Sequence, residues 1–332
     1  MIKYPPRLEL AKLPTPLTKL EKFKIPNFDG NLWVKRDELT GTEVSGNKIR
    51  KLEFSIAHAL GEGCNTLITC GGVQSNHCRA TAILGSQLGL KVHLILRGEK
   101  PTLPEGNLLL DYLAGAEISF LSQDQWSDHE KFAEELQEIY LGSGDKAHFI
   151  PIGASDEIGL WGYIAAFEEL LKDFKDNDIE PDYIITATGS GGTQGGLIVG
   201  TRLFSSRAKI RAFNVCDSAS YFEKKIREDV SLWKQRYKID FDEGGLEIST
   251  LEGYMGPAYG EADDIVFETI ANLSRAEGLF LDPVYTGKAF HGMISELQLG
   301  EQGQLPGSNN VVFIHTGGLF GVFPQQKRFK FN

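Results

Sequence analysis

Long apolar runs are missing from this chain of 332 residues. None approaches the ~20 consecutive apolar residues that a membrane-spanning helix needs, so we expect no membrane partner. The first 20 residues are interrupted by Pro5, Pro6, Pro14 and Pro16 and do not resemble a signal peptide. The expected location is therefore the cytoplasm.

Cysteine is also scarce, with only Cys64, Cys70, Cys78 and Cys216 in the whole chain. Their spacing matches no metal-ligand motif, and they are too few for a disulfide framework. We therefore expect no metal site and a reducing compartment, where free thiols persist.

Positive charge is in deficit, because 34 Lys and Arg residues face 45 Asp and Glu residues, for a formal net charge of -11. Such a chain is repelled by nucleic acid and by anionic membrane surfaces, which argues against both as main partners. The hydrophobic share of 41% and the charged share of 24% are ordinary for a globular protein. The length is sufficient for two domains.

What the sequence has in abundance is alternation between short apolar segments and segments with helical spacing. The segments expected to be buried strands are 66–69, 92–96, 118–121, 183–187, 210–215 and 311–315. Strands that alternate with helices at this spacing predict an α/β fold with parallel sheets and crossover helices. We interpret the polar stretch 172–182 as a crossing between domains.

One short stretch carries the first chemical signal. Ser45, Gly46 and Asn47 are typical helix-start residues, and apolar residues then recur at helical spacing. Lys48 would lie at the first helical position, where the helix dipole disfavours a cation. A lysine that loses its proton easily can form a Schiff base with a carbonyl cofactor. The alternative is a basic helix start, with Lys48, Arg50 and Lys51 in solvent.

A second signal is the glycine-rich run from Thr188 to Gly196, which follows a predicted strand. The helix after it is expected to begin near Leu197. Glycines let backbone N–H groups converge on an anion, and a helix start adds positive potential, so the run predicts a phosphate site. It is not a Walker A loop, and Gln194 occupies the last glycine position of the dinucleotide pattern. The alternatives are a turn that binds nothing and a dinucleotide-dependent oxidoreductase.

Taken together, several motifs resemble those of a known enzyme group. They are Ser45-Gly46-Asn47-Lys48-Ile49-Arg50-Lys51-Leu52-Glu53, Gln74-Ser75-Asn76-His77, Gly106-Asn107-Leu108-Leu109-Leu110, Asp282-Pro283-Val284-Tyr285-Thr286-Gly287-Lys288 and His315-Thr316-Gly317-Gly318. In this order they resemble the fold-type II pyridoxal phosphate enzymes, the tryptophan synthase β-subunit group. Within that group the similarity is to the branch of 1-aminocyclopropane-1-carboxylate (ACC) deaminase and D-cysteine desulfhydrase. The match runs from about Leu13 to Gly318.

The resemblance implies a tryptophan synthase β-subunit-like fold, with two three-layer domains and twisted, mostly parallel sheets. A discontinuous large domain, residues 1–50 and 161–332, would bind the cofactor, and residues 51–160 would form the small domain. Pyridoxal 5'-phosphate would be the cofactor, a small amino acid the substrate, and the chain would form a homodimer.

The resemblance also implies which residues bind the cofactor. Lys48 would hold it covalently, and Asn76 would hydrogen-bond its phenolic oxygen. Thr286 would face the pyridine nitrogen, and Thr316 would lie beside it. The phosphate would be held by Ser190, Gly191, Gly192 and Thr193.

On the substrate side, the resemblance implies that Ser75 and the backbone N–H groups of Asn76 and His77 bind the carboxylate. Tyr259 and Tyr285 would be catalytic and line the substrate. Freed Lys48 or Ser75 would remove the α-proton. From the residues alone, each tyrosine could instead be a core residue, and His77 could simply cap a helix.

Thr286 and Thr316 bear on the reaction, because ACC deaminases have glutamate and leucine at these places. A neutral threonine would leave the pyridine nitrogen unprotonated and the cofactor a weaker electron sink. That favours β-elimination of D-cysteine to pyruvate, ammonia and hydrogen sulfide, which makes the chain a carbon–sulfur lyase. The alternatives are ACC deamination, a lyase for another β-substituted amino acid such as cysteate, and a cofactor carrier without turnover. Cys78 and Ser45 depart from the usual residues of the branch.

Overall fold

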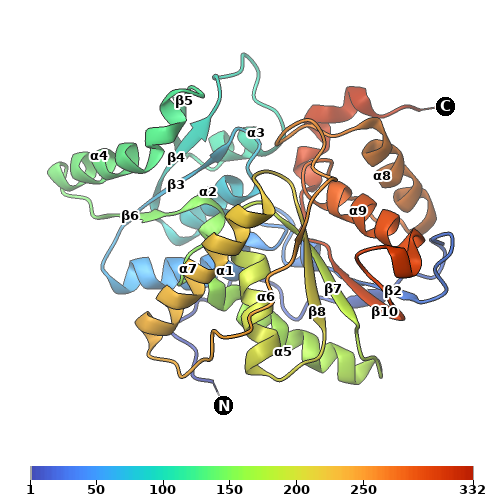
Figure 1. The fold of residues 1–332 in the computed structure, drawn as a ribbon. Helices are drawn as coiled ribbons and strands as arrows, with labels where there is room; N and C mark the ends of the chain where they lie inside the picture. The colour runs from blue at the N-terminus through green and yellow to red at the C-terminus, as the bar shows by residue number, and fades with distance from the viewer. Residues whose placement is uncertain (1, 332) are drawn as a thin grey trace.

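The computed structural model describes residues 2–331 as two β-sheets with helices packed on both faces of each (Figure 1). In the larger sheet the strand order is β1-β2-β10-β7-β8-β9, and in the smaller it is β5-β4-β3-β6. All neighbours pair in parallel except β1, which runs antiparallel to β2. The predicted α/β class with mostly parallel sheets is confirmed.

The strands are β1 Leu17–Lys19, β2 Asn31–Lys35, β3 Thr66–Gly72, β4 Lys91–Arg97, β5 Glu117–Leu121, β6 Ala147–Ile150, β7 Tyr183–Thr188, β8 Lys209–Asn214, β9 Thr250–Leu251 and β10 Asn310–Ile314. The α-helices are α1 Lys48–Gly61, α2 Asn76–Leu88, α3 Gly106–Leu113, α4 His129–Gly142, α5 Leu160–Asp176, α6 Gly192–Leu203, α7 Ala219–Tyr237, α8 Asp264–Glu277 and α9 Thr286–Gln298. Short 3-10 helices are η1 Asp37–Leu39, η2 Gln125–Asp128, η3 Ile152–Ala154, η4 Gly300–Gln302, η5 Leu319–Gly321 and η6 Phe323–Arg328.

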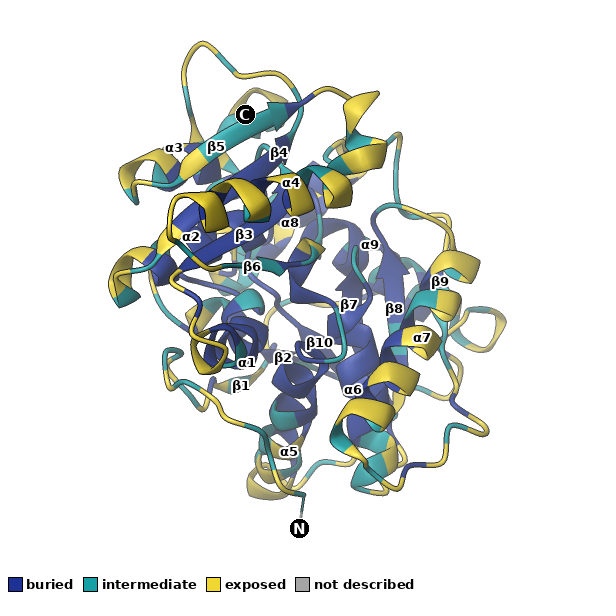
Figure 2. Cartoon of the chain, turned by 90° about the vertical axis from the view of Figure 1, so that its left-hand side faces the viewer, coloured by how far each residue is buried: buried dark blue, intermediate teal, exposed yellow. Residues whose placement is uncertain are grey.

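Alternating residues of the larger sheet separate two apolar cores. Ile184 and Val312 face α5, α6 and α7, whereas Ile185 and Phe313 face α8 and α9. In the smaller sheet, α1, α2 and α3 cover one face and α4 covers the other. Figure 2 shows the central strands β3 and β7 buried, the edge strand β5 partly exposed, and the outer faces of α4 and α7 exposed. The larger sheet is built from strands near both ends of the chain, and the smaller sheet from strands between residues 66 and 150. The domain boundaries near residues 50 and 160 stay a prediction.

Two details differ from the sequence predictions. The stretch 172–182 is not a crossing, because α5 continues through Asp176 with Phe174 buried in the core. The helix after the glycine-rich run begins at Gly192 rather than near Leu197. It can begin there because Gly191 adopts a φ of +85°, which turns the chain directly from β7 into the helix.

Close helix crossings hold α1 in place. A Cβ on Gly162 of α5 would lie 2.6 Å from the carbonyl oxygen of Arg50 on α1. One on Gly196 of α6 would lie 2.8 Å from the carbonyl oxygen of Leu160, which places α6 equally close to α5. Only glycine permits such close backbone contact. Within residues 2–331, no helix has the length and apolarity to cross a bilayer.

Candidate active site

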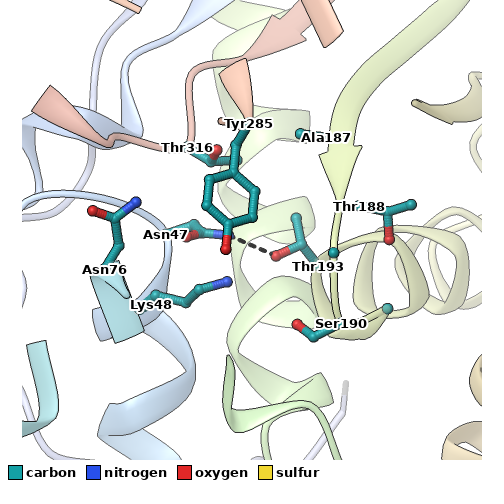
Figure 3. A pocket seen from close by; sticks show the side chains of 11 residues that line it. Asn47, Lys48, Asn76, Ala187, Thr188, Ser190, Thr193, Tyr285 and Thr316 are labelled. Atoms are coloured by element: carbon teal, nitrogen blue, oxygen red, sulfur yellow. Dashed lines mark hydrogen bonds between the residues drawn. The ribbon is translucent and has the colours of Figure 1, made fainter. Parts of the chain in front are cut away.

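A cavity forms where segments far apart in the sequence converge. It is lined by Asn47, Lys48, Asn76, Ala187, Thr188, Gly189, Ser190, Gly191, Thr193, Tyr285 and Thr316 (Figure 3). These residues come from the starts of α1, α2, α6 and α9 and from the ends of β7 and β10. In open α/β sheets, ligands bind outside the carboxyl ends of parallel strands, which is where this cavity lies.

Lys48 is the titratable residue at the centre of the cavity. It begins α1, and its side chain points into the cavity (Figure 3). Burial away from water lowers the pKa of Lys48 to about 8, from an ordinary 10.5. About a tenth of its amino groups is therefore neutral and nucleophilic at pH 7, far more than for an ordinary lysine.

The backbone before Lys48 is tied to the segment after β10. Asn47 N–H donates to the carbonyl oxygen of Thr316 at 3.1 Å. Gly46 has a φ of +112°, and a Cβ there would lie 2.6 Å from that same oxygen. This contact explains why glycine precedes the lysine, and it fixes the start of α1 against the cavity.

The solvent-exposed alternative for Arg50 and Lys51 is wrong, because both side chains are buried. Lys51 is one helical turn from Lys48 and donates from Nζ to Ser155 Oγ at 3.1 Å. Burial, followed by the nearby charge of Lys48, lowers the pKa of Lys51 well below its ordinary value. The i,i+3 spacing of the two lysines was the sequence signal for a second amine on this face.

Ser155 organises the glycine-rich turn. Its hydroxyl lies 2.8 Å from Ser190 Oγ and accepts from Gly192 N–H at 3.1 Å. A Cβ on Gly192 would lie 2.6 Å from this hydroxyl and 3.1 Å from the amino group of Lys51. The turn itself contains no basic residue, but the buried Lys51 from α1 supports it.

The residues of this turn fit a phosphate group. Thr188 Oγ1 is buried without a hydrogen-bond partner and belongs to the cavity wall. Thr193 Oγ1 accepts from Asn47 Nδ2 at 2.9 Å, which joins the turn to the start of α1 (Figure 3). An unsatisfied hydroxyl, a buried amine and the N-terminus of α6 together favour an anion.

The start of α2 provides the opposite wall. Ser75 is the N-cap, and its hydroxyl accepts from Cys78 N–H at 3.2 Å. Asn76 lines the cavity, and its Oδ1 accepts from Asn107 Nδ2 at 3.1 Å. Asn107 is buried and also hydrogen-bonds Gln74, so it holds the whole loop.

The side chain of His77 faces the core rather than the cavity. Thr69 Oγ1 donates to Ile150 O, so it accepts from His77 Nε2, which lies 2.7 Å away. Burial, followed by the charges of Lys48 and Lys51, lowers the pKa of His77 well below its ordinary value. The ring is neutral, and only the backbone N–H of His77 remains for a ligand at this helix start.

Two tyrosines meet at the cavity edge. The hydroxyls of Tyr259 and Tyr285 lie 2.6 Å apart, and Tyr285 lines the cavity. Burial raises the pKa of Tyr259 to about 12 and that of Tyr285 well above its ordinary value. Both hydroxyls therefore keep their protons at neutral pH. One hydroxyl donates to the other, and the remaining proton can be donated to a third group.

Thr286 and Thr316 differ in their positions. Thr316 lines the cavity, whereas Thr286 is fully buried and is not among the lining residues. The hydroxyl of Thr286 donates to Asp282 Oδ1 at 2.7 Å and accepts from Asp282 N–H at 2.8 Å. Because its one proton is used, Thr286 has only a lone pair left for another group.

The predicted residues that line the cavity are Lys48, Asn76, Ser190, Gly191, Thr193, Tyr285 and Thr316. Those outside its lining are Ser75, His77, Gly192, Tyr259 and Thr286. The sequence reasoning missed Asn47, Lys51 and Ser155 as parts of the site, and it did not single out Thr188 within the glycine-rich run. Within residues 2–331, no three His, Cys, Asp or Glu side chains are grouped to hold a metal ion.

Residues 8–317 match the protein family described as "Pyridoxal-phosphate dependent enzyme". This chain belongs to that family. Its fold is that of the fold-type II pyridoxal phosphate enzymes, and pyridoxal phosphate is the cofactor that a family member of this kind uses.

Relatives of this pyridoxal phosphate enzyme cover nearly all of the chain. The bifunctional D-cysteine desulfhydrase/ACC deaminase of Arabidopsis thaliana is 37% identical over 95% of this chain and 78% of the relative. A Thermotoga maritima protein named for ACC deaminase is 38% identical over 97% and 99% of the two chains. The crystal structure of an ACC deaminase homologue has a TM-score of 0.84 at 32% identity, covering 97% of this chain and 95% of the other.

Proposed function

We propose that this enzyme catalyses β-elimination of D-cysteine, or of a related small β-substituted amino acid, to pyruvate, ammonia and hydrogen sulfide. The observation that supports the proposal best is the protonated pair Tyr259 and Tyr285, 2.6 Å apart, at the edge of a cavity that contains a lysine with a lowered pKa. Such a site provides a base and an acid on the same substrate.

In this proposal Ser190, Gly191 and Thr193 would hold the cofactor's phosphate, near Lys51, and Lys48 would bond to its carbonyl carbon. Asn76 would hydrogen-bond the cofactor, and Thr316 would contact it from the end of β10. Gly192 belongs to the glycine-rich turn that would hold the phosphate, and Thr286 maintains the turn before α9 through Asp282. When bound, pyridoxal phosphate withdraws electrons from the α-carbon of the amino acid.

The chain's own residues perform the remaining tasks. The backbone N–H groups of Asn76 and His77, with Ser75, bind the substrate carboxylate at the positive end of α2. Lys48 Nζ, neutral above about pH 8, takes the α-proton, with Ser75 as the other candidate. As the Cβ–S bond breaks, its electron pair leaves on sulfur, and Tyr285 supplies a proton. The released enamine takes up water and gives pyruvate and ammonia.

ACC deamination is the second candidate, and two observations favour it. The Thermotoga relative is named for ACC deaminase alone, whereas the Arabidopsis relative is named for both activities. The hydroxyl proton of Thr286 is also donated to Asp282. The presence of threonine rather than glutamate at this position is therefore a weaker argument against ACC deamination. A cytoplasmic homodimer belongs to the same proposal in either case.

A purified-protein assay distinguishes the two reactions. The holoenzyme is incubated with D- and L-cysteine and with ACC, and pyruvate, sulfide, 2-oxobutyrate and ammonia are measured. We expect pyruvate and sulfide in equal amounts from D-cysteine. 2-Oxobutyrate from ACC, with no pyruvate from D-cysteine, would overturn the choice. Borohydride reduction followed by peptide mapping is expected to place the cofactor on Lys48.

A further inference from the structure

A second, larger cavity lies on the far side of the tyrosine pair. Its volume is about 550 Å³, and its lining includes Gln74, Arg97, Gln123, Tyr259 and Gln325. It therefore contains one cation, an aromatic ring and amide groups, and within residues 2–331 no acidic side chain lines it.

Arg97 provides the positive charge of this cavity. It is the last residue of β4, and Gly98 after it adopts a φ of +129°, which turns the chain away. The guanidinium carbon lies 5.4 Å from the ring centre of Tyr259 and 5.4 Å from that of Trp126. Among the described residues, Arg97 contacts no carboxylate and makes no side-chain hydrogen bond, so its donors remain available.

Tyr259 connects this cavity to the catalytic one. Its ring face lies against Arg97, while its hydroxyl meets Tyr285, which lines the cavity around Lys48. A Cβ on Gly72 at the end of β3 would lie 3.2 Å from the Tyr259 ring, so the ring is packed closely on that side. Tyr285 thus lines the cavity that contains Lys48, and Tyr259 lies between Tyr285 and Arg97.

We infer that this second cavity binds the far end of the substrate's β-substituent, and that Arg97 selects substituents ending in an anion such as a carboxylate. The preferred class would be β-thio-substituted amino acids that carry a second acidic group beyond the sulfur. The inference rests on the proposed elimination. The α-proton leaves, the Cβ–S bond breaks with both electrons on sulfur, and the thiolate product keeps its acidic end. Water then converts the enamine to pyruvate and ammonia.

A matched pair of substrates tests the charge alone. S-carboxymethyl-cysteine and S-carbamoylmethyl-cysteine have nearly the same size, but only the first ends in an anion. Both substrates are tested with the holoenzyme in their D and L forms. We expect kcat/KM to be about tenfold to 100-fold higher for the acid than for the amide, which is the size of effect that a hydrogen bond to a charged group produces. Arg97→Gln is expected to abolish this preference, so that kcat/KM becomes about equal for the two substrates.

Two further variants control for folding and net charge. Arg97→Lys keeps the charge and is expected to retain part of the preference. Arg202→Gln removes an arginine that pairs with Asp242 on the surface and should leave the preference unchanged. An equal kcat/KM for the two substrates in the unmodified enzyme, or a preference that survives Arg97→Gln, would overturn the inference.

A binding experiment separates failure of this inference from failure of the proposed reaction. The ligand 3-(carboxymethylsulfanyl)propanoate lacks the amino group and cannot be turned over. Calorimetry with the holoenzyme should show tighter binding of this diacid than of its amide-ended counterpart, and Arg97→Gln should remove the difference. This result would stand even if no amino acid were converted. Equal affinity for both ligands would contradict the inferred anion site at Arg97.

Discussion

At the scale of single residues, the site depends on two amines one helical turn apart, a half-buried one at Lys48 and a buried one at Lys51. Lys48 faces the cavity and Lys51 supports the glycine-rich turn through Ser155. Burial is the main cause that lowers the pKa of both. The helix dipole, which the sequence suggested as the cause, acts in the same direction.

The lowered pKa of Lys48 predicts how a substitution changes stability. The folded chain has a pKa of about 8 at Lys48 and the unfolded chain about 10.5, so the folded state binds fewer protons between these values. Burial of this amine therefore opposes folding below about pH 8, and the penalty disappears as the pH rises toward 10.5. We expect Lys48→Met to stabilise the apoprotein at pH 7 by about 1–3 kcal/mol.

Urea unfolding of the apoprotein at pH 7 and pH 10 measures this effect. The difference in the free energy of unfolding between Lys48→Met and the unmodified chain should be smaller at pH 10 than at pH 7. Lys224→Met, at a lysine with 79% of its side chain exposed, is the matched control and should show little change at either pH. A stabilisation that is the same at both pH values would contradict the prediction.

At the scale of elements, the active site depends on how closely α1 packs on α5. Gly162 lies against the backbone of Arg50 and Lys51, and a Cβ there would come within 2.7 Å of Lys51 N. Backbone atoms cannot shift as a side-chain end can, so a methyl group must separate the two helices. The start of α1, which carries Lys48, would move with them.

We therefore expect Gly162→Ala to destabilise the protein by about 1–3 kcal/mol, as overpacking does, and to lower kcat. Denaturant unfolding and steady-state kinetics measure the two effects. The control is Gly142→Ala at the end of α4, where an added Cβ would meet nothing within 4 Å. Helix propensity predicts a neutral or slightly stabilising change there. If the two variants have the same free energy of unfolding and the same kcat, α1 and α5 can accommodate the methyl group and the prediction is wrong.

At the scale of the whole molecule, a buried ionic network joins the N-terminal segment, α1 and α5. Arg50 donates to both oxygens of Asp37 and to Glu169. Lys35 contacts Glu169 at 2.6 Å and Asp173 at 2.5 Å. These contacts join the larger sheet to the helix that carries Lys48.

The pKa of Glu169 predicts an acid-sensitive stability. Burial alone would raise this pKa, but hydrogen bonds and attraction from Arg50 and Lys35 outweigh it and lower the pKa to about 2. The ionised carboxylate therefore stabilises the fold above about pH 4.5, and this contribution is lost as the pH falls toward 2. At pH 7, Glu169→Gln should destabilise the protein by about 3 kcal/mol, because it leaves Arg50 with Asp37 and Lys35 with Asp173 as their one remaining carboxylate each.

Urea unfolding between pH 3 and pH 7 tests this prediction. The difference in the free energy of unfolding between the unmodified protein and Glu169→Gln should become smaller toward pH 3. Glu134→Gln, at an exposed glutamate on α4, should track the unmodified protein throughout. A gap that does not depend on pH would rule out the ionised carboxylate as its cause.

Local patterns in the sequence were enough for the element order, the α/β class, the family resemblance and Lys48 with its glycine-rich partner. Periodicity and turn residues act over a few positions, so they can be read from the sequence directly. For the same reason, the start of α6 and the continuation of α5 were misjudged. They depend on Gly191 adopting a positive φ and on Phe174 reaching the core.

Only the tertiary structure decided which polar groups meet. Lys51 and Ser155 lie 104 positions apart, and Arg50 and Glu169 lie 119 apart. The commitment of Thr286 to Asp282 and the position of Arg97 against Tyr259 are likewise set by packing. Burial and pairing of charges depend on which surfaces the fold brings together, and no spacing along the chain encodes them.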